Sequence, residues 1–106
     1  MELCEKTISE LCELIKKGEI KSIDITKNVL ERIKENDGSI NAFVTVCEEV
    51  AMEMAKTADK KIESGNITGI TGIPIGIKDN YLTKDILTTA GSKILHNYIP
   101  PYNATV

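Results

Sequence analysis

The chain has 106 residues, enough for one small domain and too few for two. Its 13 basic and 16 acidic residues give a net charge of -3, which argues against a domain that grips nucleic acid by itself, because phosphate binding needs a clustered positive surface. With no Trp, one Phe and three Tyr, large aromatic side chains are scarce, so we expect a modest core built mainly from Ile, Val, Leu and Ala.

The first predicted element is an amphipathic helix that follows Thr7. Residues 7–10 read Thr-Ile-Ser-Glu and have the form of a capping box, in which Thr7 and Glu10 accept each other's backbone amides. Gly18 supplies the stop. The apolar residues of this helix repeat at helical spacing at Ile8, Leu11, Cys12 and Ile15.

A second helix is predicted to begin near Ser22, whose hydroxyl can cap it, with Asp24 in the first turn suiting the helix dipole. Residues 36–38 read Asn-Asp-Gly, which predicts its end. Its apolar stripe is formed by Ile25, Val29, Leu30 and Ile33.

Residues 42–46 are short and β-branched, so we expect a brief extended segment there. A third helix is predicted over about residues 48–64, because small and apolar residues recur on one face. Glycines then punctuate a loop that leads into an apolar run at residues 73–77. This run, opened by Gly72 and Pro74, predicts a buried strand.

The composition changes beyond Asn80. Residues 83–92 predict a loop followed by a short strand, and residues 92–97 a single helical turn before Pro100. Three helices followed by short strands indicate an α/β architecture in which helices cover a mixed sheet, with a helical part at residues 1–66 and a strand-and-loop part at 67–106. A lone apolar strand needs partner strands, so the domain is either small and irregular or its sheet continues in residues outside this chain.

Three cysteines, Cys4, Cys12 and Cys47, bear on redox state and metal binding. Their number is odd and no Cys-x-x-Cys pair occurs, so neither a disulfide framework nor a zinc site is favoured. A site that adds the single histidine, His96, is conceivable by residue type, but the spacing argues against it, and we expect His96 on the surface. Reduced thiols, no signal-peptide pattern and no apolar run of membrane-spanning length predict a soluble cytoplasmic protein.

Lys78 is the candidate catalytic residue. It ends the apolar run Gly-Ile-Pro-Ile-Gly-Ile of residues 72–77 and is followed by Asp79. Burial disfavours a charged ammonium, which is how a lysine becomes a base. The pattern alone is also typical of a solvated lysine that caps a strand, with Asp79 as an ordinary turn residue. A nucleotide loop is excluded, because neither Gly-Lys-Ser/Thr nor Gly-x-Gly-x-x-Gly occurs.

Residues 72–80 resemble the lysine-bearing strand of the amidase signature family. Further stretches, at residues 41–46, 88–95 and 98–106, are similar to the tRNA-linked amidotransferase branch of that family. The resemblance implies a catalytic set of a serine nucleophile, a second serine in a cis peptide, and a lysine that acts as base through the second serine. Only the lysine has a counterpart here, Lys78. Ser92 belongs to a matched structural segment without a catalytic role, and Asn103 stands where many relatives carry an aspartate.

The resemblance implies that the complete subunit hydrolyses glutamine through an acyl-enzyme. It would then supply ammonia to a partner subunit of a heterotrimer-like complex, which amidates glutamate carried on tRNA(Gln). ATP and Mg are implied only for that partner, and tRNA would be bound mainly there; no cofactor, metal or membrane contact is expected for this chain. Because both serines are expected downstream of Val106, we expect the chain alone to be inactive.

Two other interpretations stay open. A stand-alone amidase acting on a small carboxamide would share the fold, although the stretch at residues 88–106 argues against it. Alternatively, the chain is a non-catalytic interaction module or a remnant, whose three-helix face docks on a partner without doing chemistry.

Overall fold

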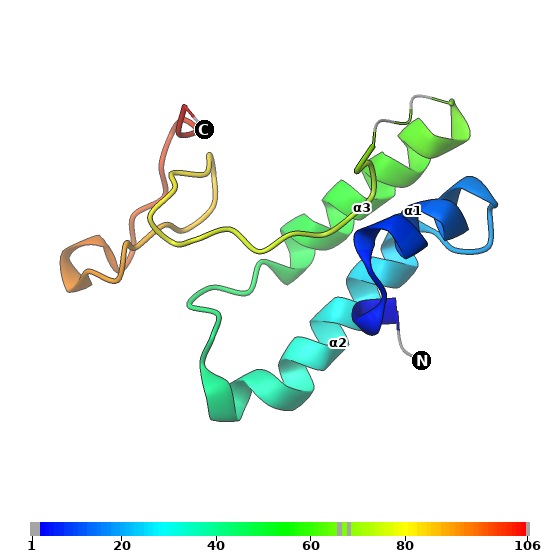
Figure 1. The fold of residues 1–106 in the computed structure, drawn as a ribbon. Helices are drawn as coiled ribbons and strands as arrows, with labels where there is room; N and C mark the ends of the chain where they lie inside the picture. Colours follow the sequence, from blue (N-terminus) through cyan, green and yellow to red (C-terminus); the bar gives the residue numbers. More distant parts are fainter. Residues whose placement is uncertain (1–2, 66, 68, 106) are drawn as a thin grey trace. The chain divides into compact units, whose positions relative to one another are not determined.

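Three α-helices dominate the computed structural model, which describes residues 3–65, 67 and 69–105 (Figure 1). The order of elements is η1 (Leu3–Glu5), α1 (Ile8–Lys16), α2 (Ser22–Ile40), α3 (Glu48–Glu63) and η2 (Lys93–Leu95), where η denotes a short 3-10 helix. The chain divides into two units. The helical unit extends to Ala42 and resumes over Glu48–Pro74; the loop unit comprises Phe43–Cys47 and the residues from Ile75 onward.

Helix α1 forms as its local sequence predicts. The Glu10 amide donates to Thr7 Oγ1 at 3.2 Å, and the Thr7 amide donates to Glu10 Oε2 at 2.9 Å. The predicted capping box is therefore confirmed. The helix ends at Lys16, and Gly18 has a φ of +76°, a left-handed conformation that glycine adopts without a steric penalty.

Helix α2 begins where predicted, but Ser22 is not its cap. Ser22 is the first helical residue, and its hydroxyl donates to the Gly72 carbonyl at 2.8 Å. The free amides at this helix end are bound instead by Asp59 of α3, whose Oδ1 accepts from the Ser22 amide at 2.7 Å and whose Oδ2 accepts from the Ile23 amide at 3.2 Å. The cap prediction is wrong because a carboxylate distant in sequence outcompetes the local hydroxyl.

The predicted end of α2 at residues 36–38 is also wrong. The helix continues through Gly38 to Ile40 and is closed by Asn41, which has a φ of +56°. A glycine inside a helix costs only about 1 kcal/mol, and asparagine tolerates the left-handed conformation, so the helix stops at the later signal. The Asp37 carboxylate secures this end, since Oδ1 accepts from the Ala42 amide at 2.7 Å. The third helix, predicted over about residues 48–64, is confirmed as α3.

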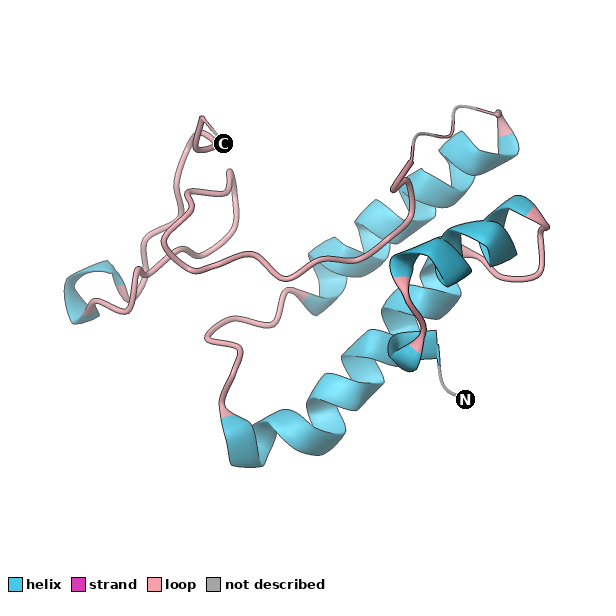
Figure 2. Ribbon diagram, viewed as in Figure 1, coloured by secondary structure: helices cyan, strands magenta, loops and turns pink. Residues whose placement is uncertain are grey.

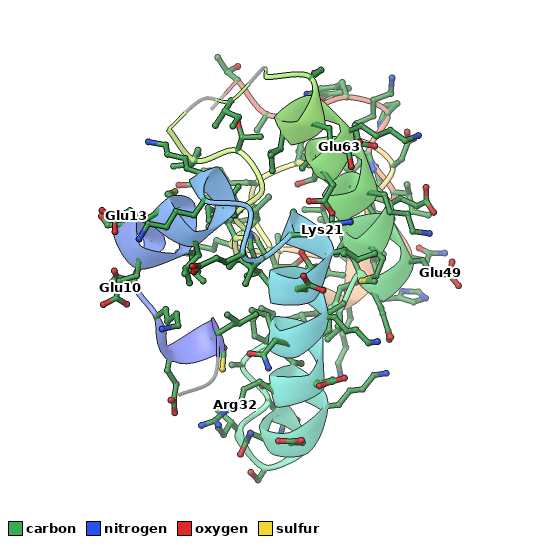
Figure 3. The ribbon with its side chains drawn as sticks, turned by 90° about the vertical axis from the view of Figure 1, so that its right-hand side faces the viewer. Glu10, Glu13, Lys21, Arg32, Glu49 and Glu63 are labelled. Carbon is green, nitrogen blue, oxygen red and sulfur yellow. The ribbon has the colours of Figure 1, made fainter. Side chains whose placement is uncertain are left out.

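The core of the helical unit is small and aliphatic, as the composition predicts. Leu11, Ile15 and Ile25 are buried together where α1 meets α2. Charged side chains on the same two helices are exposed, among them Glu10 and Glu13 of α1 and Arg32 of α2, which are labelled in Figure 3. Partly buried residues packed against the cluster are Leu3, Ile20, Val29, Ile62 and Ile73.

Gly72, near the end of the helical unit, packs closely against α2 and α3. Its φ is +88°, and a Cβ at this position would lie 3.2 Å from Ser22 Cβ and 3.3 Å from Ile62 Cδ1. Only glycine combines this conformation with so close an approach. Gly72 therefore fixes the point from which the chain leaves the helices toward Lys78.

The strands predicted at residues 73–77 and within 83–92 are not confirmed. The described part of the chain contains helices, turns and irregular backbone only (Figure 2). A strand exists only when its amides and carbonyls pair with a neighbour. Ile75 and Ile77 are instead 70% and 55% exposed. The predicted turn at residues 92–97 does form, as η2. Across the residues that are described, no helix is both long and apolar enough to traverse a bilayer.

Candidate functional site

Lys78 lies in the loop unit on irregular backbone, and its side chain is exposed. Its carbonyl accepts a hydrogen bond from the Tyr81 amide at 3.1 Å, so a tight turn follows it immediately. The burial expected for the end of a covered strand is absent. The described residues therefore do not enclose the Lys78 amine.

Asp79 binds this turn to a distant segment of the same unit. Its Oδ1 accepts from the Thr89 amide at 2.9 Å, and its Oδ2 accepts from the Thr89 hydroxyl. The Asp79 carbonyl accepts from the Ala90 amide at 2.9 Å. The Gly91 amide in turn donates to Thr89 Oγ1 at 3.3 Å, which orients that hydroxyl toward the carboxylate. Asp79 is therefore held at both its side chain and its backbone.

A second set of hydrogen bonds ties the loop to the last segment of the chain. These contacts fix residues 82–88 along residues 98–104, and Thr88 and Pro100 become buried between them. The backbone donors and their acceptors are Ala104 to the Leu82 carbonyl at 2.8 Å, Asp85 to the Pro100 carbonyl at 3.0 Å, Thr88 to the Tyr98 carbonyl at 3.0 Å, and Lys84 to Asn103 Oδ1 at 2.8 Å. An aspartate at position 103 would offer the same acceptor, so either residue can make this contact.

The remaining polar candidates have structural roles. Ser92 caps η2, its hydroxyl accepting from the Ile94 amide at 3.3 Å. His96 is exposed, as expected, and its Nδ1 lies 2.8 Å from the Lys93 carbonyl oxygen. Within the described ranges, no group of three or more His, Cys, Asp or Glu side chains could hold a metal ion.

The Asp79 network was outside the reach of sequence reasoning. Asp79 follows the candidate lysine, yet its main partner, Thr89, lies ten residues away. An aspartate before an asparagine is typical of a local turn, which is the role assigned to it from sequence. The two adjacent threonines at 88 and 89 are the one sequence feature that hints at this network, because threonine hydroxyls often donate or accept hydrogen bonds in loops.

Hydrogen bonds from Thr89 hold the pKa of the Asp79 carboxyl below its usual range; the bond from the hydroxyl has the largest effect and the bond from the amide the next largest. Partial burial acts in the opposite direction, and the Gly91 amide lowers the pKa slightly further. A carboxyl with a depressed pKa stabilises the fold above its ordinary pKa of about 3.9, and this contribution is lost as pH falls toward the folded-state value. We therefore expect the Thr89 amide to exchange hydrogen faster, relative to the intrinsic rate, as pH drops below about 4.

That acid sensitivity should be absent from an Asp79→Asn variant, because an amide does not titrate in this range. Nuclear magnetic resonance measurement of the protection factor of the Thr89 amide at several pH values tests the expectation. A protection factor in the unmodified protein that is independent of pH from 5 to about 2 would contradict it.

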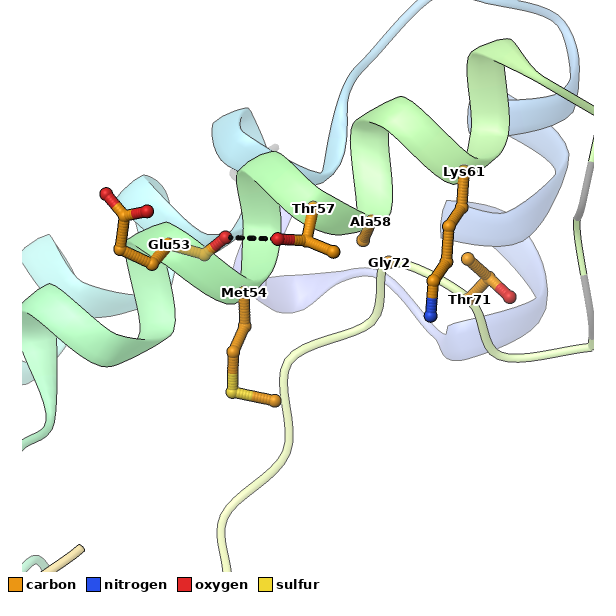
Figure 4. A pocket seen from close by; sticks show the side chains of 7 residues that line it. All are labelled: Glu53, Met54, Thr57, Ala58, Lys61, Thr71 and Gly72. Carbon is orange, nitrogen blue, oxygen red and sulfur yellow. Dashed lines mark hydrogen bonds between the residues drawn. The ribbon is translucent and has the colours of Figure 1, made fainter. Parts of the chain in front are cut away.

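The helical unit carries a separate surface pocket between α3 and residues 71–72 (Figure 4). Thr57 donates from its hydroxyl to the Glu53 carbonyl at 3.1 Å along one wall, and Met54, 65% exposed, forms part of another. Its lining does not include Lys78, and the pocket joins none of the candidate catalytic groups. The full lining is Glu53, Met54, Thr57, Ala58, Lys61, Thr71 and Gly72.

Comparison with known proteins gives a consistent result. The amidase family profile matches residues 24–106. The chain is 55% identical over 106 residues to a glutamyl-tRNA(Gln) amidotransferase subunit of Thermoanaerobacter pseudethanolicus, which covers 100% of this chain and 22% of that relative. It is 50% identical over 105 residues to the corresponding subunit of Enterococcus faecalis, covering 98% of this chain and 21% of the relative. The corresponding subunit of Thermodesulfovibrio yellowstonii is 46% identical over 106 residues, covering 100% of this chain and 22% of the relative. The chain thus spans about a fifth of the length of these relatives.

Proposed function

Because the chain belongs to the amidase family, we propose that it is the N-terminal part of the glutamine-hydrolysing subunit of a glutamyl-tRNA(Gln) amidotransferase. The observation that carries this proposal is the 55% identity, across all 106 residues, to a subunit of such an amidotransferase. The family match includes Lys78 and the hydrogen-bonded loop around it. A stand-alone amidase would share the family match but offers no reason for this identity along the whole chain.

In the proposed reaction, a serine attacks the side-chain carboxamide carbon of glutamine, ammonia leaves, and water hydrolyses the resulting ester. Both serines of the family's catalytic set would lie outside these 106 residues. Lys78 would take the proton from the nucleophile through the second serine. A solvated lysine is almost fully protonated at neutral pH, so this role requires that the complete subunit close a dry site around the amine. Lys78 is exposed here, which is expected if the residues that would enclose its amine belong to the rest of the complete subunit.

We propose that residues 73–77 become a strand of a mixed sheet in the complete subunit, with residues 1–66 and 67–106 forming parts of one amidase domain. The exposure of Ile75 and Ile77 supports this, since alternate apolar side chains on irregular backbone are stable only when other strands and a second layer cover them. The helices α1–α3 would cover one face of that sheet.

The ammonia would pass to a partner subunit in a heterotrimer-like complex. That partner would bind ATP and Mg and most of the tRNA, and would amidate glutamate carried on tRNA(Gln). The net charge of -3 supports placing the main tRNA surface elsewhere. An ATP-dependent step on aminoacylated tRNA also favours a cytoplasmic location, where this substrate is made and used.

The test is to purify the complete subunit, alone and with the subunits encoded beside it, and to measure two products. We expect glutamate to be released from glutamine, and Gln-tRNA(Gln) to form from Glu-tRNA(Gln) only when the partners and ATP are present. Turnover of small carboxamides with no effect of any partner would indicate a stand-alone amidase instead. Absence of turnover in every combination would leave the interaction-module interpretation.

A further inference from the structure

We propose that Asp79 is a positioning residue for Lys78: by binding Thr89 with its carboxylate, it holds the backbone from which the lysine amine is presented. This inference rests on the proposed function, in which Lys78 is the base. It adds a role for a residue that does not itself touch the reacting atoms.

The first support is the number of contacts concentrated on Asp79. Both carboxylate oxygens accept from Thr89, one from the amide at 2.9 Å and one from the hydroxyl, and the Asp79 carbonyl accepts from the Ala90 amide at 2.9 Å. Thr89 is only 7% exposed and Asp79 is half-buried, so these bonds are partly shielded from competing water. Hydrogen bonds to a charged acceptor are also roughly twice as strong as those between neutral groups.

The second support is the conformation of the receiving segment. Ala90 and Gly91 have φ values of +51° and +69°, two consecutive left-handed residues of which one is not glycine. Alanine rarely adopts this conformation, and such strain persists only where surrounding contacts enforce it. In this loop it allows Thr89 to direct its amide and its hydroxyl to the same carboxylate, while the Gly91 amide donates back to that hydroxyl at 3.3 Å.

The third support is that Lys78 is held from one side. Residues 73–78 form no helix or strand, and Gly76 precedes the lysine by two positions, so this stretch constrains it little. The hydrogen bonds that restrain Lys78 come after it, from the Tyr81 amide to the Lys78 carbonyl and from the Asp79 network. A lysine side chain has a flexible four-carbon stem, so its amine is placed only as well as its backbone.

A catalytic group must be held closely, because a displacement of 1 Å can lower the rate about 100-fold. We therefore expect Asp79→Ala, made in the complete subunit, to lower kcat for glutamine hydrolysis by about 10- to 100-fold while leaving KM within about twofold. Thr89→Val, which removes the hydroxyl and keeps the amide, should also lower kcat. Thr89→Ser, which keeps the hydroxyl, should retain near-normal kcat.

The double variant Asp79→Ala with Thr89→Val tests whether the two residues affect kcat through their shared hydrogen bonds or independently of each other. If the two residues act as a unit, its kcat is no lower than that of Asp79→Ala alone. A matched control is Asn103→Ala, which removes another bond of the same unit, from the Lys84 amide at 2.8 Å. We expect this variant to lower the melting temperature and to leave kcat unchanged.

Lys78→Ala is measured alongside, so that two kinds of failure are distinguished. If Lys78→Ala is inactive and Asp79→Ala and Thr89→Val keep normal kcat, the positioning role is overturned and the proposed function stands. If Asn103→Ala lowers kcat as much as Asp79→Ala does, the effect is general loop stability and the positioning role is again overturned. If Lys78→Ala keeps its turnover, the base assignment fails and this inference fails with it.

Discussion

Replacing Lys78 with alanine in the complete subunit is expected to lower kcat for glutamine hydrolysis by about 10²- to 10⁴-fold, the usual contribution of a general base. The protein should remain folded, because Lys78 is exposed and lies outside the cluster of buried side chains. Release of glutamate from glutamine measures the first effect. The midpoint of thermal unfolding, unchanged within a few degrees, measures the second.

Two further variants decide what the lysine contributes. Lys78→Arg retains the positive charge but cannot give up its proton at neutral pH, so it should be as inactive as Lys78→Ala. Lys84→Ala removes another exposed lysine of the loop unit and should keep normal turnover. High activity in Lys78→Arg would mean that the charge, and not proton transfer, is required. Near-normal turnover in Lys78→Ala would remove Lys78 from the catalytic set.

The helices could be predicted from sequence where the signals are local. The box formed by Thr7 and Glu10 lies within one turn, and the same residues cap α1 in the structure. Helix α3 follows from the spacing of its small and apolar residues and is found over Glu48–Glu63, within one residue of the expected end. Such signals need no knowledge of other parts of the chain, because each partner lies three or four residues away.

The errors arise where the decisive partner is far away in sequence. Ser22 has the chemistry of a cap, but the helix end is bound by Asp59, 36 and 37 residues distant from the two amides that it accepts. The local hydroxyl is then released to bind the Gly72 carbonyl. No pattern within a helix-length window contains this exchange, since it depends on how α2 packs against α3.

The site divides in the same way. Lys78 could be singled out from sequence, because the apolar run before it and the stretch that resembles a known family are both formed by adjacent residues. The binding of Asp79 by Thr89 could not, because the loop between them has no periodic pattern that sets its path. The missing strands have a third cause: an extended segment forms a ladder only with a partner, and residues 73–77 find none among the described residues.

Ile25→Ala is expected to have the largest effect on stability. Ile25 is completely buried and belongs to the cluster with Leu11 and Ile15 that joins α1 to α2. Truncating a buried isoleucine to alanine typically costs about 2–5 kcal/mol, through lost burial and the cavity left behind. A small aliphatic core has little reserve against such a loss. We therefore expect the amides of α1 and α2 to exchange hydrogen at least about 30-fold faster, measured by mass spectrometry on the complete subunit.

Ile40→Ala is the matched control, because it makes the same chemical change in the same helix at a side chain that is 67% exposed. Little apolar area is lost there, so the free energy of unfolding should stay within about 0.5 kcal/mol of its normal value. Ile25→Val, which removes one methylene group from the buried site, should fall between the two, at about 0.5–1.5 kcal/mol. Equal exchange rates in Ile25→Ala and Ile40→Ala would mean that burial at position 25 does not hold α1 and α2 together. The ordered series would instead show that this cluster stabilises α1 and α2.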